Sequence, residues 1–68
     1  MAEKLGNLLR DARSMAGWTQ AELAERVGVS RKTINTVENG VFVPSTILSL
    51  KLAEALGTSV EDLFFLVE

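Results

Sequence analysis

Residues 19–40 read TQAELAERVGVSRKTINTVENG. It holds two short amphipathic helical patterns joined by a glycine-containing turn. Thr19, followed three residues later by Glu22, forms a capping box, which satisfies two free backbone N–H groups at the start of a helix. Gly28 tolerates the positive φ at which a helix ends, and Ser30 is a capping residue for the next helix. The stretch therefore predicts a helix-turn-helix.

The residues between these caps agree with the packing of such a unit. Two helices that cross closely need a small side chain at the crossing, and Ala24 supplies it. Apolar side chains must fill the inner angle between the helices, and the candidates for this role are Leu23, Val27, Val29, Ile34 and Val37. Each position alone is a weak signal, but their agreement makes the motif specific.

Helical patterns with caps continue on both sides of this motif. The spacing of leucines and alanines predicts a helix over about residues 2–16, which Gly17 ends. Ser45 caps a further helix that Gly57 ends, and Ser59 caps a short fifth helix. The last residues are apolar and have no clear period. The sequence thus predicts an all-α fold, a compact five-helix bundle in a single domain that spans residues 1–68.

Composition narrows the class of function. The chain has 68 residues, no Cys and no His, so the commonest nucleophile, general base and zinc ligands are absent. We therefore expect no enzyme, no metal site and no cofactor, and nothing implies a small-molecule ligand. There is neither a signal-peptide pattern nor an apolar run long enough to span a bilayer, so a membrane is not expected and the protein should be cytoplasmic. The net charge of −2 does not favour a nucleic-acid partner, but its distribution matters more than the total.

The charges of the second motif helix, about residues 31–38, are reversed. A helix N-terminus is partially positive, so acids belong in the first turn and bases in the last. Here Arg31 and Lys32 occupy the first turn and Glu38 the last, whereas no other capped start has a base in its first turn. A local rule that is broken at one place suggests a functional position.

Contact with DNA would explain the two basic side chains in the first turn of this helix. Arg31 and Lys32 can donate hydrogen bonds to guanine, and in a helix-turn-helix the N-terminal residues of the second helix meet base edges. Asn35 can pair with adenine, and the methyl group of Thr36 can meet that of thymine. The alternative for all four is an ordinary solvated helix surface. Ser30 and Thr33 are candidate phosphate contacts at the helix start, although Thr33 could instead bond back to the first turn.

The chain resembles the Cro/cI-type (XRE-like) helix-turn-helix regulators. The resemblance rests on residues 19–40 followed by PS, LKLAEALG and SVEDLF, and it extends over about residues 9–64. It implies a bundle of the lambda-repressor DNA-binding type, usually dimeric, whose third helix enters the major groove. It also implies phosphate contacts at Gln20 and Asn39, and a structural ion pair between Glu38 and Arg13.

The expected function is therefore a sequence-specific regulator of transcription, with repression as the expected sense. It would bind double-stranded DNA, at a roughly palindromic operator, as a homodimer. The loop after residue 40 departs from the family because it is apolar where a lysine is common. Exposed apolar residues are the candidates for the dimer surface: Val43, Ile47, Phe65, Leu66 and Val67. The same features leave an alternative open, a protein-interaction module of the same fold that acts as an antitoxin-like or adaptor component.

Overall fold

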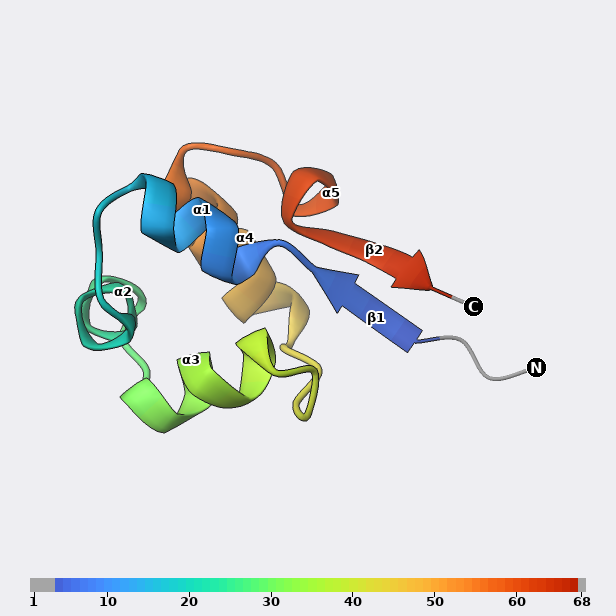
Figure 1. Cartoon of the computed structure of the whole chain (residues 1–68), viewed down its shortest axis with the longest axis horizontal. Coiled ribbons are helices and arrows are strands. Elements are labelled where there is room, and N and C mark those ends of the chain that lie inside the picture. The colour runs from blue at the N-terminus through green and yellow to red at the C-terminus, as the bar shows by residue number, and fades with distance from the viewer. Residues whose placement is uncertain (1–3, 68) are drawn as a thin grey trace.

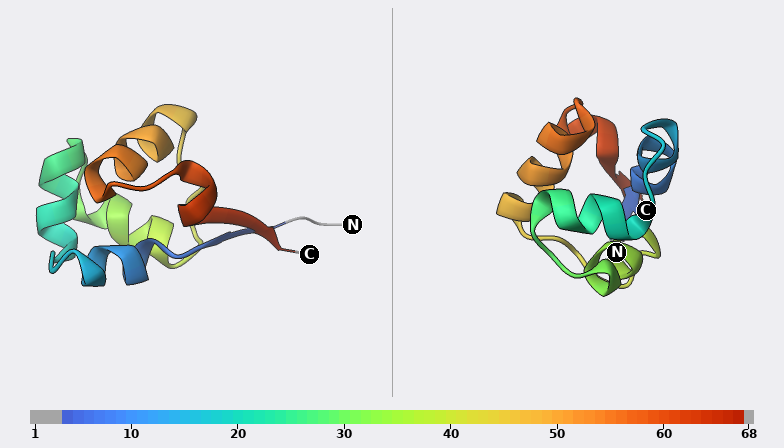
Figure 2. Two further views of the ribbon diagram at one scale, coloured as in Figure 1. Left: turned by 90° about the horizontal axis from the view of Figure 1, so that it is seen from above. Right: turned by 90° about the vertical axis from the view of Figure 1, so that its left-hand side faces the viewer.

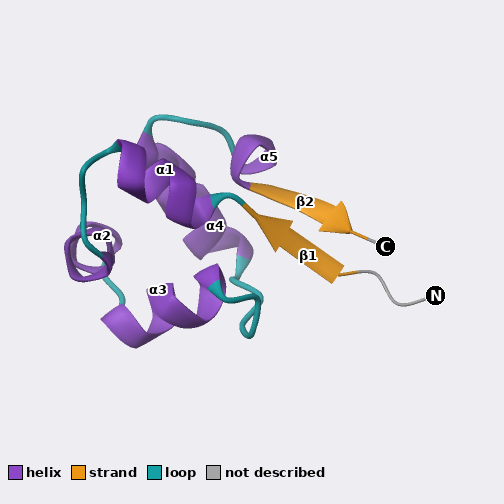
Figure 3. Cartoon of the chain, in the orientation of Figure 1, coloured by secondary structure: helices purple, strands orange, loops and turns teal. Residues whose placement is uncertain are grey.

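Capped helices form the body of the molecule, and a pair of short strands extends from one end of it (Figures 1 and 3). The computed structural model describes residues 4–67. The elements in chain order are β1 (Lys4–Asn7), α1 (Leu9–Met15), α2 (Gln20–Val27), α3 (Arg31–Glu38), α4 (Thr46–Leu56), α5 (Val60–Leu63) and β2 (Phe64–Val67). The family-type bundle of five helices is confirmed, but the all-α description is only approximate.

The predicted N-terminal helix is wrong over its first part. Within the range predicted as helical, residues 4–7 form β1, and the helix begins only at Leu9; residues 2 and 3 lie outside the described part of the chain. β1 pairs antiparallel with β2, so that Leu5 faces Leu66 and Gly6 faces Phe65. The prediction from the helical period was wrong because Leu5 and Leu9 also fit a strand followed by a helix. The partner strand, β2, lies at the far end of the sequence, so no local pattern indicates the pairing.

The strand pair projects from the helices, as Figure 2 shows. The molecule therefore measures 36 Å along its longest axis and 22 and 20 Å along the others. Phe64 and Leu5 face the helices and pack on the core, whereas Phe65 is 44% exposed. The strands thus extend an apolar surface beyond the bundle.

The helix caps form as the sequence predicts. Thr19 Oγ1 accepts a hydrogen bond from the backbone N–H of Glu22, and Glu22 accepts one from Thr19, which completes the capping box. Ser45 and Ser59 accept the equivalent bonds at the starts of α4 and α5. Gly28, at the end of α2, has a φ of 76°, which a residue with a Cβ rarely adopts.

One core joins the helices to the start of β2. Each fully buried Leu or Ile contributes about 1.5–3 kcal/mol, which matters greatly in a chain of this size. The inner angle between α2 and α3 is filled by apolar side chains, as predicted. The buried residues are Leu9, Leu23, Ala24, Val27, Ile34, Val37, Leu48, Leu52, Ala53, Leu63 and Phe64.

No helix in residues 4–67 has the length and apolarity to cross a bilayer, and the longest of them, α4, has 11 residues.

Candidate nucleic-acid interface

The first turn of α3 presents two cations to solvent. Ser30 Oγ accepts a hydrogen bond of 3.2 Å from the backbone N–H of Thr33, so the helix start is satisfied without a carboxylate. Arg31 and Lys32 follow at once and both are exposed. Lys32 makes no side-chain hydrogen bond or ion pair within the described residues, so its ammonium group is available to a ligand.

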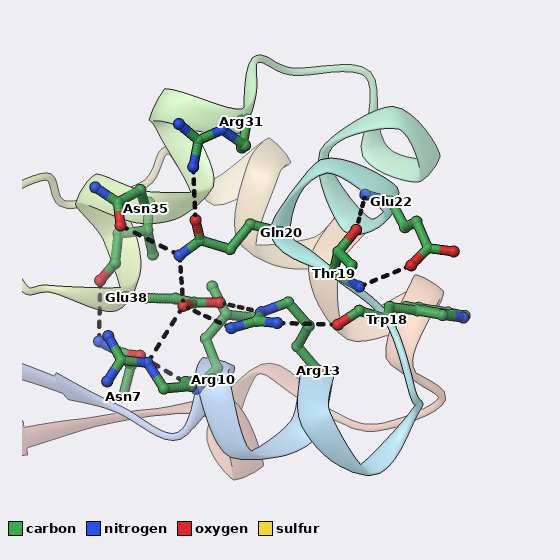
Figure 4. A network of polar contacts seen from close by, with 12 residues as sticks. Asn7, Arg10, Arg13, Trp18, Thr19, Gln20, Glu22, Arg31, Asn35 and Glu38 are labelled. Carbon is green, nitrogen blue, oxygen red and sulfur yellow. Dashed lines mark hydrogen bonds and ion pairs between the residues drawn. The ribbon is translucent and has the colours of Figure 1, made fainter.

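The guanidinium of Arg31 is held by α2. Its Nη1 donates to Oε1 of Gln20 at 3.3 Å, and the amide nitrogen of Gln20 in turn donates to Asn35 and Glu38 (Figure 4). Gln20, predicted to hold a phosphate, therefore lies at the centre of a side-chain network in the unbound protein. Its phosphate contact stays a prediction.

The second turn of α3 is half-buried and well bonded. Oδ1 of Asn35 accepts from Gln20 and from Asn39, each at 3.2 Å. Thr36 Oγ1 donates to the carbonyl of Thr33 at 2.9 Å, which leaves its methyl group as the part able to meet an apolar ligand. By the helical period, the outer face opposite the buried Ile34 and Val37 is shared by Lys32, Asn35, Thr36 and Asn39.

The acid at the end of α3 is withdrawn from solvent. The side chain of Glu38 is 0% exposed, and its Oε2 lies 2.6 Å from Nε of Arg13 in α1. Arg13 also donates to the other carboxylate oxygen at 3.2 Å and to the backbone carbonyl of Trp18 at 2.9 Å (Figure 4). The structure thus brings together the predicted pair of Arg13 and Glu38.

The electrostatics of this pair favour the charged forms. Burial opposes ionisation of Glu38, but hydrogen bonds from Arg13 and Gln20 and the positive charge of Arg13 outweigh it, so the pKa of Glu38 lies below its ordinary value. The bond to Glu38 likewise raises the pKa of Arg13. Glu38 is therefore an anion whose charge is neutralised inside the protein.

Two arginines of this region make contacts that the sequence did not predict. Arg10 lies 3.5 Å from Glu38 through its Nε, and its Nη2 donates to Oδ1 of Asn39 at 3.1 Å. Its spacing of three residues from Arg13, which places both on one side of a helix, was the available signal. Arg26 stacks on Trp18, with the guanidinium carbon 4.1 Å from the ring centroid.

The predicted dimer residues fall on different surfaces. Phe65, Leu66 and Val67 lie together on β2. Val43 lines a cleft of about 460 Å³ between β1 and the α3–α4 loop. Ile47 lines a separate groove of about 300 Å³ beside the α2–α3 turn.

Comparison with known proteins agrees with this geometry. A family model described as Helix-turn-helix matches residues 9–63. The chain belongs to the XRE-like helix-turn-helix family. An uncharacterised HTH-type transcriptional regulator of Methanothermobacter thermautotrophicus is 52% identical over 62 residues, covering 90% of each chain.

Solved structures of a controller protein and of a gene regulator share the fold. The restriction-modification controller protein C.AhdI of Aeromonas hydrophila is 35% identical with a TM-score of 0.75, covering 79% of this chain and 82% of its own. The clp gene regulator ClgR of Corynebacterium glutamicum is 39% identical with the same TM-score of 0.75, covering 79% of this chain and 57% of its own. The predicted family and the predicted class of function, a helix-turn-helix transcriptional regulator, are thereby confirmed.

One relative bears on the alternative function. Antitoxin HipB of Escherichia coli is 34% identical over 56 residues, covering 82% of this chain and 60% of its own. The relatives named as transcriptional regulators are more similar, as the 52% identity of the archaeal protein shows.

Proposed function

We propose that this helix-turn-helix protein regulates transcription by binding a specific double-stranded DNA sequence, with α3 as the recognition helix in the major groove. The observation that supports the proposal most strongly is the charge of the solvent-facing surface of α3. That surface has two exposed cations, Arg31 and Lys32, and its one acid, Glu38, is buried against Arg13. An acidic protein thus presents a recognition helix without an exposed carboxylate.

Base readout is assigned to the first two turns of the recognition helix. Arg31 can donate two hydrogen bonds to O6 and N7 of guanine, and Gln20 holds its guanidinium in place before DNA arrives. Lys32 adds a second donor on the outer face. Asn35 and Thr36 follow one turn later on the outer face and would meet adenine and a thymine methyl group.

Phosphate contacts are assigned to the edges of the motif. Gln20 and Ser30 stand at the starts of α2 and α3, where free N–H groups attract anions. Thr33 lies in the first turn of α3, and Asn39 directly follows its last turn. These contacts would fix the register of the protein on the duplex without reading its sequence.

We further propose that two copies associate through the apolar residues of β2 and bind a roughly palindromic operator. In such a dimer the two recognition helices lie ~34 Å apart and enter successive major grooves. A dimer that covers a promoter blocks access to it, so repression is the expected sense, in the cytoplasm of a prokaryotic cell. The proposal includes no cofactor, metal or enzymatic step.

Selection of bound sequences from a random DNA pool tests this proposal. We expect enrichment of one half-site, repeated in inverted orientation at a fixed spacing. The affinity for mixed-sequence DNA should also fall steeply between two salt concentrations, because phosphate contacts release counterions. An unenriched pool together with weak, salt-independent binding would overturn the proposal and favour the adaptor alternative, which the exposed loop residues Val41 and Val43 would then serve.

A further inference from the structure

Asn7, the last residue of β1, connects three parts of the molecule with one side chain. Its Nδ2 donates to the backbone carbonyl of Val37 in the last turn of α3 at 3.0 Å. Its Oδ1 accepts from the backbone N–H of Leu9 at 3.1 Å, which satisfies a free N–H group at the start of α1. In the sheet it faces Phe64 of β2. The side chain is partly buried, so water competes poorly for these bonds.

The residue before Asn7 makes this segment fit closely against β2. A Cβ at Gly6 would overlap with the ring of Phe65 and approach Cγ2 of Val67 to 2.8 Å. The absence of a side chain at Gly6 therefore lets Phe65 and Val67 lie over the backbone of β1. Gly6 and Asn7 thus attach the apolar strand pair on one side and the end of α3 on the other.

The next residue strengthens the attachment. The backbone N–H of Leu8 donates to the carbonyl of Leu63 at 2.8 Å, so the chain after Asn7 is also tied to α5. Arg10 and Arg13 also contact α3, but they do so from α1. The bond from Asn7 to Val37 joins α3 directly to the strand pair. A change in the angle between sheet and helix must therefore break or distort this bond.

We propose that Asn7 is a positioning residue that sets the orientation of the recognition helix relative to the strand pair, and thereby the half-site spacing that the dimer accepts. The inference rests on the proposed function, in which the strand pair forms the dimer surface. A two-fold axis repeats any change of angle in both copies, so the displacement of the two recognition helices doubles. One base pair corresponds to only ~3.4 Å along the duplex, so DNA reports small displacements.

Asparagine suits this position because its amide both donates and accepts. Asn7→Asp keeps the acceptor for Leu9, which a helix start favours, but replaces the donor to Val37 with an anion. This variant therefore separates the capping of α1 from the attachment of α3. Asn7→Gln keeps both groups but displaces them by one methylene.

The test uses DNA libraries in which two copies of the selected half-site are separated by a variable number of base pairs. We expect the wild-type protein to prefer one spacing sharply. Asn7→Asp should keep the half-site sequence but accept neighbouring spacings, with affinity at the preferred spacing reduced about threefold to tenfold, the cost of one lost hydrogen bond. If Asn7→Asp does not fold, Asn7→Gln should broaden or shift the spacing in the same assay.

Val60→Ala is the matched control, because Val60 packs on the core from α5 and its truncation lowers stability without altering the attachment. It should retain the wild-type spacing profile. If the wild type prefers one spacing sharply and both Asn7→Asp and Asn7→Gln keep that same preference, the inference about Asn7 is overturned and the proposed dimer is retained. A wild-type protein that selects single half-sites would overturn the dimer, and the inference with it.

Discussion

Arg13 and Glu38 form a two-point ion pair between α1 and the end of α3, with 2.6 Å between Nε and Oε2 and 3.2 Å between Nη2 and Oε1. The two side chains are only 14% and 0% exposed. The pair fixes the end of the recognition helix that lies away from its cations, so it supports the angle at which the other end is presented. Pairs of this kind position elements more than they stabilise the fold, but removing one partner is costly.

Arg13→Met should therefore destabilise the protein strongly, because Glu38 is left buried without its main partner. We expect a loss of about 3–5 kcal/mol in the free energy of unfolding, measured by urea denaturation. Lys51→Met removes one exposed cation that forms no ion pair within residues 4–67, so it should change stability by less than about 0.5 kcal/mol. Equal effects of the two substitutions would contradict a structural role for the pair.

Acid should destabilise the fold through Glu38 and, to a lesser degree, Glu22. Both pKa values are lowered in the folded protein, Glu38 by its partners despite burial and Glu22 by the capping-box bonds with Thr19. The unfolded chain then binds more protons, so stability rises with pH in this range. The stability that these two carboxylates contribute should be fully present above pH 4.5, the ordinary pKa of a glutamate. It should be lost as the pH falls through their lower pKa values in the folded protein.

Urea denaturation of the wild type and Glu38→Gln between about pH 3 and pH 7 measures this contribution. At about pH 7 the variant should be less stable than the wild type, and it should lose less of its stability as the pH is lowered. The sequence has no histidine, so the curve of the wild type should be flat between about pH 5.5 and pH 7. A parallel loss in both proteins would show that Glu38 is not the group that titrates.

Arg31→Ala tests base readout by the recognition helix. We expect a loss of about 1–3 kcal/mol in binding to the selected operator and a relaxed preference at one base position of each half-site. Lys51→Met removes the same unit charge from α4, outside the recognition helix, and should leave the base preference unchanged. An unaltered base preference in Arg31→Ala would remove Arg31 from the readout.

The helix-turn-helix could be predicted because its signals are local. A cap and its partner lie three residues apart, as with Thr19 and Glu22 or Ser59 and Asp62, so sequence spacing alone identifies them. The ion pair of Arg13 and Glu38 was expected from the family resemblance. The strand pair could not be predicted in the same way, because β1 and β2 are only four residues each and meet from opposite ends of the chain. The bonds of Asn7 depend on that pairing and were missed with it.

Gly6→Ala should show how closely the strands fit. The added Cβ forces Phe65 and Val67 away from β1, so we expect a loss of about 1–3 kcal/mol in stability, as in an overpacked core. In a Phe65→Ala background most of the overlap is gone, and the same substitution should cost clearly less. Urea denaturation of the two single variants and the double variant measures this coupling. Additive losses would mean that the ring of Phe65 does not lie over Gly6.

The choice between β2 and the groove lined by Ile47 as the dimer surface can be decided with a matched pair of residues. Leu66 on β2 is 72% exposed and Ile47 on α4 is 69% exposed, so neither is needed for the core of one copy. If two copies associate through β2, Leu66→Asp places two carboxylates near the two-fold axis and should give a monomer at tens of micromolar, on the order of a hundredfold weaker association. Ile47→Asp should remain a dimer.

Sedimentation velocity distinguishes these outcomes, and unchanged circular dichroism confirms that both variants are folded. The monomeric variant should also bind operator DNA far more weakly while keeping the half-site preference, because each recognition helix is intact but the second half-site is lost. A dimer that survives Leu66→Asp but dissociates with Ile47→Asp would place the interface at the groove beside the α2–α3 turn instead. The exposed end of β2, residues 65–67, would then need another function, because within one copy only Leu5 and Phe64 of the strand pair pack on the core.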